Sequence, residues 1–293
     1  MKYAIRYYEG CRALKDADEI IIKYTKKTSK LLDYIKEDIK ENQRLIIDIT
    51  LYEGNFIEDG NLSIIDVAKT LHSFLAILTS NKDEYIEKYK ERNIPFFFID
   101  RVDSLDVMNY FIDCGVSDIY IANELGFYLG DIAPYIHEKN VIIRAFPNVA
   151  QSIIEETPVI SKFFIRPDDI YLYEDLIDVF EFFGSLNRQS VLMEIYKEET
   201  WSDILDLIII GLNLDLDNRL FNPYFGEARV NCRKRCTFGK CNICKRSFTL
   251  GETLRDQLVE EYMEAKEDGN SRVNKEDLQN ASASSEGLIE TLP

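Results

Sequence analysis

Four cysteines lie close together near the C-terminal end of the sequence, in the stretch RVNCRKRCTFGKCNICKRSF at 229–248. Cys232, Cys236, Cys241 and Cys244 have the spacing C-x₃-C-x₄-C-x₂-C. Thiolates are soft ligands that suit zinc or an iron–sulfur cluster. Zinc ribbons usually separate their two cysteine pairs by about a dozen residues or more, whereas one short segment can wrap an iron–sulfur cluster. The sequence predicts a metal site that holds an iron–sulfur cluster or Zn²⁺, and the alternative is a reduced thiol loop without metal.

Basic residues surround these cysteines, although the chain as a whole has a formal net charge of −17. They either offset the charge of four thiolates or contact phosphate. The acidic balance of the whole chain disfavours extended nucleic-acid binding, because its field repels a polyanion. The basic residues of this stretch are Arg229, Arg233, Lys234, Arg235, Lys240, Lys245 and Arg246.

The apolar runs of the chain are far shorter than the roughly 20 residues that a membrane-spanning helix needs. The N-terminal MKYAIRYYEG has no apolar signal core. We therefore expect a cytoplasmic protein with no membrane partner. Thiols stay reduced in that compartment, which favours metal over disulfides for the cysteine cluster.

Short apolar runs recur along the chain, and several are continuous, which is typical of parallel strands buried on both faces. Amphipathic stretches predict helices between them. One of these begins after Ser104 as the cap and ends at Gly115. The expected strands lie at 2–8, 19–25, 44–50, 95–102, 118–124, 141–148, 163–167 and 191–197, and the expected helices at 31–39, 63–78, 83–92, 104–115, 127–139, 170–184 and 200–212.

Eight strands with helices between them predict an α/β fold, a TIM-like (β/α)₈ barrel with a C-terminal cysteine-rich metal-binding extension. The connection at 9–18 is too short for a crossover helix, so the first run is expected to be a hairpin partner or an irregular opening strand. A doubly wound sheet is the rival fold, but no glycine-rich phosphate loop follows a strand. We expect a barrel over 1–212, the cysteine-rich extension with a helix over 213–265, and a flexible polar tail over 266–293.

Barrel enzymes place their chemistry at the carboxyl ends of the strands. Arg144 and Arg166 follow apolar residues of consecutive predicted strands, and two guanidinium groups there could clamp a carboxylate or phosphate. We therefore predict a binding site for an anionic small molecule or phosphate-bearing ligand, made of Arg144, Arg166, Asp100, Glu124 and Glu194. The alternative is that both arginines pair with those carboxylates as a buried structural network. The polar residues expected at the strand ends are Asp48, Asp100, Arg101, Asn123, Glu124, Arg144, Asn148, Arg166, Asp168 and Glu194.

The stretch GVSDIYIANELGFYLGDIAPYIHEKNVIIRAFPNVAQS at 115–152 resembles the collagenase-like peptidase family. That family includes barrel-shaped iron–sulfur proteins that hydroxylate RNA bases or ubiquinone precursors. FFIRPDDIYLYEDLIDV at 163–179 looks like the strand and acidic helix that follow in the family, so the resemblance covers about 95–185. It implies a barrel and the use of a cluster. The family's His-Gly-Ala element with its spaced cysteines is absent, so no ligand or catalytic residue is carried over and peptidase activity is not supported.

Two functions fit these observations. The first is a metal-dependent, iron–sulfur enzyme that acts on an anionic substrate. The second is a non-catalytic barrel that assembles with a protein partner and uses the cysteine cluster as a structural zinc site. The catalytic residues are unknown in either case, because His72 and His137 both lie in helical patterns typical of structural histidines.

Overall fold

A computed structural model of the chain describes residues 1–7, 16–25, 40, 42–52, 74–80, 86–147, 151–154, 157–159, 165–182, 186–198, 204–205, 216–217 and 225–230. The chain divides into two compact units. The first consists of Met1–Pro147 and Tyr173–Glu194, and the second of Asn148–Leu172 and Ile195–Pro293. None of the described helices is both long enough and apolar enough to cross a membrane.

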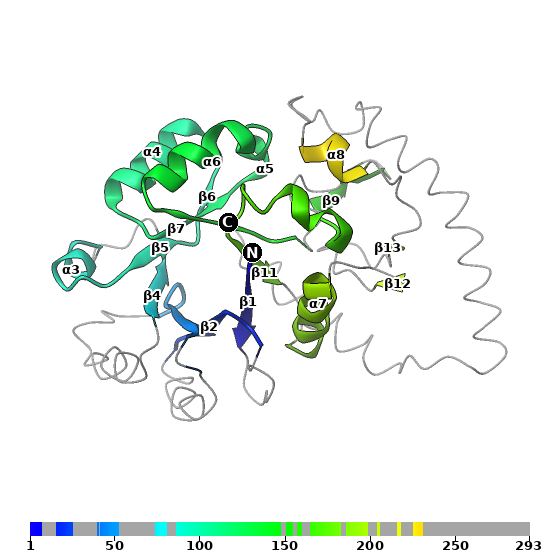
Figure 1. The fold of residues 1–293 in the computed structure, drawn as a ribbon. Helices are drawn as coiled ribbons and strands as arrows, with labels where there is room; N and C mark the ends of the chain where they lie inside the picture. The colour runs from blue at the N-terminus through cyan, green and yellow to red at the C-terminus, as the bar shows by residue number, and fades with distance from the viewer. Residues whose placement is uncertain are drawn as a thin grey trace. The chain divides into compact units, whose positions relative to one another are not determined.

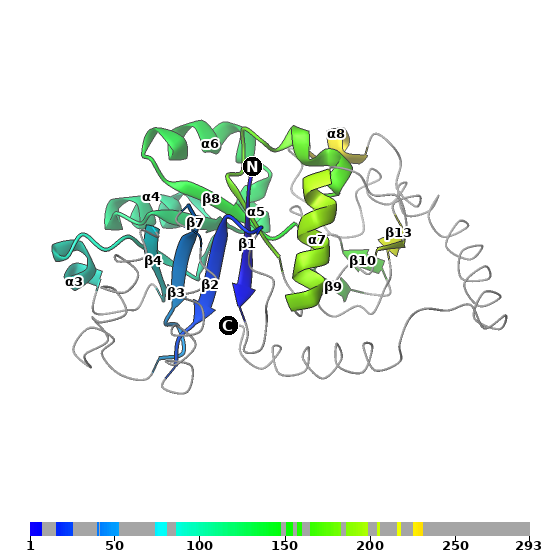
Figure 2. The same cartoon turned by 60° about the horizontal axis from the view of Figure 1, so that its bottom comes forward.

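Nine parallel strands form a nearly closed barrel in the first unit (Figures 1 and 2). Their order around the sheet is β5-β4-β3-β2-β1-β11-β8-β7-β6. β5 and β6 are separated by Ile99 and Asp100 alone, so the two ends of the sheet belong to one run of chain. The strands are β1 (Lys2–Tyr7), β2 (Glu19–Lys23), β3 (Arg44–Asp48), β4 (Phe74–Thr79), β5 (Phe96–Phe98), β6 (Arg101–Val102), β7 (Asp118–Ile121), β8 (Ile142–Ala145) and β11 (Val179–Phe182).

Neighbouring barrel strands follow one another along the chain, which is the arrangement of a TIM-like barrel and confirms the predicted fold class for this unit. The strands at β5–β6, β7 and β8 are adjacent and parallel, as predicted. The Ser117 amide donates to the Phe96 carbonyl at 2.8 Å and so joins the start of β7 to β5. β1 pairs in parallel with β2, so the hairpin predicted as one alternative for the first run is wrong.

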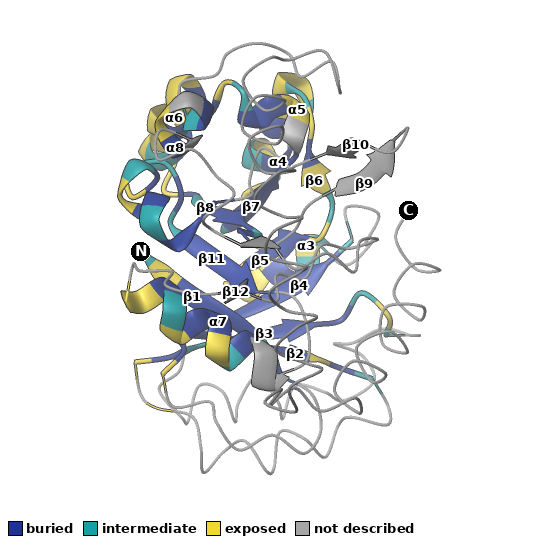
Figure 3. Cartoon of the chain, turned by 90° about the vertical axis from the view of Figure 1, so that its right-hand side faces the viewer, coloured by how far each residue is buried: buried dark blue, intermediate teal, exposed yellow. Residues whose placement is uncertain are grey.

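Continuous apolar strands form the wall of the barrel because both of its faces are covered. Ile20, Ile21 and Ile22 of β2 are completely buried, and so is Ile46 of β3. Figure 3 shows most residues of the barrel strands as buried, whereas the surrounding helices also contain exposed residues. The described helices of this unit are α3 (Ile86–Glu91), α4 (Leu105–Cys114), α5 (Asn123–Gly126) and α6 (Leu129–Glu138), and α7 (Leu186–Glu198) begins in it.

α4 begins and ends where the sequence predicts. The Ser104 hydroxyl accepts a hydrogen bond from the Val107 amide at the start of the helix. Gly115 follows the last turn with φ of 78°, a conformation that glycine adopts without strain. Phe111 packs edge-on against Phe98 at 4.7 Å between ring centres, and this contact holds the helix on β5.

Two barrel strands lie where helices were predicted. β4 overlaps the end of the helix expected at 63–78, and β11 falls within the helix expected at 170–184. Both are apolar runs, FLAILT and VFEF, that are short enough for a buried strand but cannot be told from a buried helix segment by periodicity. The neighbour of β8 in the barrel is therefore β11 and not the predicted strand at 163–167.

Two predicted strands are also wrong. Residues 191–197 belong to α7, whose buried Leu192, Met193 and Tyr196 are spaced for one face of a helix. Within the predicted strand at 163–167, the described residues are 165–167, and they form no strand. Pro167 begins the 3₁₀ helix η1 (Pro167–Leu172).

The second unit contains short elements. β9 (Gln151–Ile154) and β10 (Thr157–Val159) form an antiparallel pair, and so do β12 (Ile204–Leu205) and β13 (Leu216–Asp217). β12 lies within the predicted helix at 200–212, which is wrong at those two residues. α8 (Phe225–Val230) packs against η1. The cysteine cluster and the tail at 266–293 lie outside the described residues.

Candidate functional site

Charged side chains lie inside the barrel at two levels. Glu19, Arg44 and Asp118 are the first residues of β2, β3 and β7, and we refer to them as the amino-end group. A second set lies farther along the barrel, near the carboxyl ends where barrel enzymes act, and Arg101 belongs to it because this first residue of β6 is in register with Tyr120. It consists of Arg6, Asp48, Arg101, Tyr120 and Glu181, and we refer to it as the mouth group.

The amino-end group is held by a bidentate ion pair. Arg44 Nη1 and Nη2 each lie 2.6 Å from an oxygen of Asp118, and the Ser117 hydroxyl donates to Asp118 Oδ1 at 2.7 Å. Burial favours the neutral form of Asp118, but the charges of Arg44 and Arg144 and these hydrogen bonds outweigh it, so the pKa of Asp118 lies below its ordinary value. Asp118 is therefore a buried carboxylate that stays ionised.

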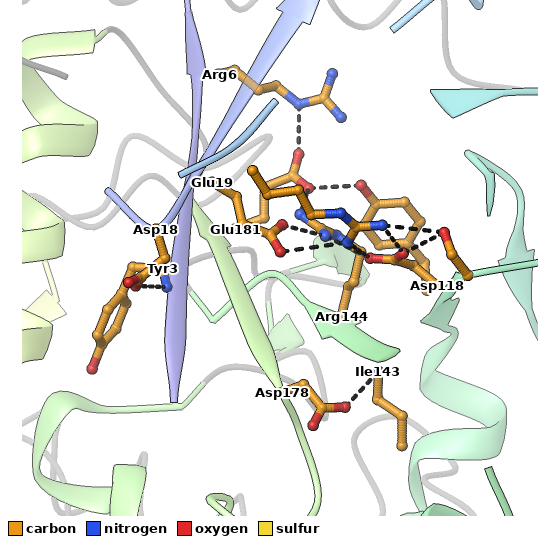
Figure 4. Close-up of polar contacts among 12 residues, drawn as sticks. Tyr3, Arg6, Asp18, Glu19, Asp118, Ile143, Arg144, Asp178 and Glu181 are labelled. Atoms are coloured by element: carbon orange, nitrogen blue, oxygen red, sulfur yellow. Dashed lines mark hydrogen bonds and ion pairs between the residues drawn. The ribbon is translucent and has the colours of Figure 1, made fainter. Parts of the chain in front are cut away.

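Arg144 of β8 joins the two groups from the centre of the barrel (Figure 4). Its Nη1 lies 2.6 Å from Glu19 Oε2 and 2.8 Å from Asp118 Oδ2, and its Nη2 lies 3.6 Å from Glu181 Oε2. Its side chain is completely buried. Burial alone would lower the pKa of Arg144, but these carboxylates and Tyr120 hold it well above the ordinary value. The guanidinium is therefore a fixed positive charge at the core.

The mouth group contains a connected chain of hydrogen bonds. Arg6 Nε donates to Glu181 Oε1 at 2.6 Å, and Arg6 Nη1 donates to Asp48 Oδ2 at 2.9 Å. The Tyr120 hydroxyl donates to Glu181 Oε2 at 2.7 Å. Burial, followed by the charge of Glu181, raises the pKa of Tyr120 well above its ordinary value. Tyr120 is consequently a neutral phenol that donates a hydrogen bond to the Glu181 carboxyl group.

Arg101 differs from the other arginines of the barrel. Within the described part of the chain its side chain makes no hydrogen bond and no ion pair. Its guanidinium lies over the Phe146 ring at 5.5 Å from the ring centre, and Phe146 in turn stacks on Tyr120 at 5.1 Å. Arg101 as a whole residue is exposed. Burial of its guanidinium group lowers the pKa of Arg101, and the charges of Tyr120, Glu181 and Glu124 partly offset this lowering. It remains a cation, since arginine keeps its proton in proteins.

The two arginines of the predicted clamp lie in different units, and each has ion-pair partners within its own unit. The ion pairs of Arg144 are with Glu19, Asp118 and Glu181, and none of these was predicted as its partner. Arg166 lies in the second unit, directly before η1 and not in a barrel strand, where its Nε and Nη2 bind Asp169 at 2.6 and 2.8 Å.

The three predicted carboxylates are dispersed. Asp100 is half-buried between β5 and β6, and Glu124 is exposed on α5. Glu194 is exposed on α7, so its predicted position at a strand end is wrong. Of the wider set expected at strand ends, Asp48 is the last residue of β3, Arg144 is the third of the four residues of β8, and Arg101 lies in the two-residue β6.

Arg6, Tyr120 and Glu181 were missed. The signal that could have found two of them is a charged residue inside an otherwise apolar strand, as in KYAIRY and VFEF. Such a residue must point to a polar interior or to solvent, because a buried charge without a partner is costly.

The four cysteines of the predicted metal site lie outside the described residues, so that site remains a prediction. Within the described residues, no group of three or more histidine, cysteine, aspartate or glutamate side chains could hold a metal ion.

Comparisons with known proteins give no family for the chain. No protein-family model matches it, and no curated protein matches it in sequence. One solved structure that is similar in fold is the 4-hydroxy-2-oxoglutarate aldolase/2-deydro-3-deoxyphosphogluconate aldolase from TTHB1, with 13% sequence identity and a TM-score of 0.40. The match covers 67% of this chain and 93% of the aldolase chain. At this level of similarity, neither a site nor a reaction can be transferred from that protein.

Proposed function

We propose that the protein is a barrel enzyme that binds a small anionic substrate at the carboxyl-end mouth, with Arg101 as the anion-binding residue. One observation carries this proposal. Arg101 presents a guanidinium at the mouth with no carboxylate partner among the described residues, whereas Arg6, Arg44 and Arg144 are ion-paired.

The chemistry of the guanidinium group supports an oxyanion as the ligand. Its planar set of N–H donors matches the two oxygens of a carboxylate or phosphate. The Phe146 ring packs against one face of the Arg101 guanidinium, and this contact limits the directions in which the guanidinium can point. The carboxyl ends of the strands are also where β/α barrels bind their substrates.

Tyr120 and Glu181 are the groups that could act on a substrate held by Arg101. Both act electrostatically on Arg101, so they lie near the place where an anion would bind. A carboxylate bonded to a neutral phenol can transfer a proton to or from a ligand. Proton transfer is therefore the reaction step that we assign to this pair.

We further propose that Cys232, Cys236, Cys241 and Cys244 hold an iron–sulfur cluster or Zn²⁺. The spacing of the four thiols and the absence of acidic residues between them support this. The weak resemblance to barrel-shaped iron–sulfur proteins favours the cluster, and in that case the protein would be a metal-dependent enzyme.

A non-catalytic assembly protein with a structural zinc site is the second candidate. The observation that favours it is the extent to which the interior charges satisfy one another, since Glu19, Asp118 and Arg144 are bound by other side chains of the chain itself. Such a protein would have no need to bind an anion at the mouth.

Titration calorimetry with sulfate separates the two candidates. We expect wild-type protein to bind sulfate, and Arg101→Gln to bind it at least about tenfold more weakly, the equivalent of about 1.4 kcal/mol. Arg101→Lys should retain part of the affinity, because it keeps the charge and loses the planar fork. Arg92→Gln, which alters an exposed arginine at the end of α3, is the matched control and should bind as wild type does. Equal binding by Arg101→Gln and wild type would favour the assembly protein.

A further inference from the structure

Arg144 makes its side-chain hydrogen bonds through one of its three guanidinium nitrogens. Nη1 donates to Glu19 Oε2 at 2.6 Å and to Asp118 Oδ2 at 2.8 Å. Nε and Nη2 are buried, and neither has a hydrogen-bond partner within the described residues. Buried N–H groups in folded proteins are almost always paired, either with the protein or with an ordered water. Two unpaired donors on a completely buried side chain therefore point to a further bound group.

The two unpaired donors of Arg144 share one edge of the guanidinium. The group is planar, and an N–H bond of Nη2 runs nearly parallel to the N–H bond of Nε, on the side away from Nη1. One oxygen atom on this edge can accept from both donors. Turning the guanidinium to find another partner would break the two bonds that Nη1 makes.

The aromatic rings beside Arg144 do not replace an oxygen acceptor. Its Cζ lies over the Phe97 ring at 5.2 Å from the ring centre, and over the Tyr120 ring at 5.8 Å. These rings attract the charge of the guanidinium, but an N–H group gains less from a ring than from an oxygen. The edge formed by Nε and Nη2 still requires an acceptor.

Glu181 has an oxygen near this edge that can accept a further hydrogen bond (Figure 4). Its Oε2 lies 3.6 Å from Arg144 Nη2, which is too far for a direct N–H···O bond. Oε2 accepts from the Tyr120 hydroxyl, and Oε1 accepts from Arg6 Nε. Because a carboxyl oxygen has two lone pairs, Oε2 can take a second donor. A group that accepts from Arg144 and donates to Glu181 would satisfy both side chains.

Water has the acceptor and donor groups that this position requires. Its oxygen can accept from Nε and Nη2 while one hydrogen points to Glu181 Oε2, and about three hydrogen bonds are usual for a buried water. A chloride ion or a carboxylate could accept but could not donate. It would also add a negative charge where Glu19, Asp118 and Glu181 already lie within 3.6 Å of the same guanidinium. The chemistry of the position therefore favours a neutral ligand.

We propose that a buried water molecule binds to the Nε–Nη2 edge of Arg144 and donates a hydrogen bond to Glu181 Oε2. This water connects the mouth group to the amino-end group, because Arg144 Nη1 is bonded to two members of the latter. It also places another exchangeable hydrogen beside the hydrogen bond between Tyr120 and Glu181. The site requires neither Arg101 nor a bound anion, so it stands or falls separately from the proposed function.

A high-resolution crystal structure of the wild-type protein, grown with sodium bromide as the salt, tests this site. We expect a single spherical peak about 2.7–3.2 Å from both Nε and Nη2 of Arg144 and about 2.5–3.0 Å from Glu181 Oε2. The peak should have no anomalous signal from bromide. A bromide ion at this edge overturns the proposal. An oxygen of the chain itself bonded to Nε or Nη2, with no water there, overturns it as well.

Nuclear magnetic resonance tests the same site in solution without a change of sequence. The Hε atom of Arg144 should show a direct Overhauser cross-peak to a long-lived water. Hε of Arg166 is the matched control, because that side chain is also buried but its Nε donates to Asp169 Oδ2 at 2.6 Å. It should show no such cross-peak. Tyr120→Phe leaves the proposed partners of the water in place and should retain the Arg144 cross-peak. Absence of the cross-peak from wild type, or its loss in Tyr120→Phe, overturns the assignment.

Discussion

At the scale of single residues, Arg144 is the centre of the barrel interior. Its guanidinium is completely buried and lies among Glu19, Asp118 and Glu181. Its charge adds to those of Arg44, which also pairs with Glu19 and Asp118, and Arg6, which also pairs with Glu181. A residue in this position is required for the neighbouring charges to be buried at all, whether or not it contacts a ligand.

Arg144→Met should therefore destabilise the protein strongly. We expect the free energy of unfolding to fall by about 3–5 kcal/mol, because the change removes the cation that lies among three buried carboxylates. Urea denaturation followed by circular dichroism measures this. Arg92→Met is the matched control on an exposed arginine and should change stability by no more than about 0.5 kcal/mol. Equal midpoints for the two variants would show that Arg144 does not hold the interior together.

The lowered pKa of Asp118 predicts that the stability of the protein falls at acid pH. Its pKa in the folded protein lies below the ordinary value of 3.8, so its contribution is present above that value and is lost as pH falls through the folded pKa. The difference in unfolding free energy between wild type and Asp118→Asn should therefore shrink as the pH is lowered from about 6 to below about 3. A difference that stays constant over this range would mean that the charge of Asp118 contributes nothing.

Residue patterns predicted part of the mouth. Asp48 and Arg101 could be expected there because each is next to the end of an apolar run. Arg6 and Glu181 could not be assigned from their strands alone, because a charged residue inside a short apolar strand faces in or out according to register. The register pairs Ala4 with both Glu19 and Glu181, which places these acids on the same face of the sheet.

At the scale of elements, the chain was most predictable where local signals agree with the fold. The Ser104 cap and the Gly115 stop both lie where the sequence placed them, since each satisfies backbone groups at the end of α4. β4 and β11 were less predictable because the pattern of a short buried run fits a strand and a helix equally well. When β5 and β6 are counted as one run, the described barrel has the eight strands predicted, in part because errors at 74–79 and 179–182 offset those at 163–167 and 191–197.

The packing of α8 against η1 can be tested by changing a single glycine, Gly226. A Cβ atom at Gly226 would overlap the carboxyl group of Asp169, which is buried and bound to Arg166 through two hydrogen bonds. Gly226→Ala should lower the free energy of unfolding by about 1–3 kcal/mol, because the ion pair must shift.

Gly130→Ala in α6 is the matched control, because a Cβ atom there has nothing within 4 Å. It should be neutral, or stabilising by up to about 1 kcal/mol, since alanine favours a helix more than glycine does. Thermal unfolding of the two variants in parallel measures the contrast. A Gly226→Ala variant as stable as Gly130→Ala would show that α8 is not closely packed on η1.

At the scale of the whole molecule, two groups of cations in this acidic chain need a physical explanation. Some are buried against carboxylates in the barrel, and others surround the cysteines at 229–248. The first setting follows from the cost of burying a charge alone. The second follows, on our proposal, from the negative charge of four metal-bound thiolates.

Metal analysis of protein purified without oxygen tests the cysteine cluster. We expect bound iron with a brown colour, or one bound zinc in a colourless protein, and loss of that metal in Cys241→Ser. Cys114→Ser is the matched control, since Cys114 lies on α4 of the barrel unit. Metal that is retained in Cys241→Ser, or absent from wild-type protein, would contradict a four-cysteine site.

The most direct measurement is anomalous diffraction from a crystal of the protein soaked in selenate, an anion of the same shape and charge as sulfate. We predict a selenium peak at the carboxyl-end mouth, with a selenate oxygen about 2.7–3.2 Å from a guanidinium nitrogen of Arg101. Tyr120 and Phe146 should lie beside the anion, because they already adjoin Arg101. A mouth without selenate, with Arg101 ion-paired to a carboxylate of the chain itself, would contradict the proposed anion site.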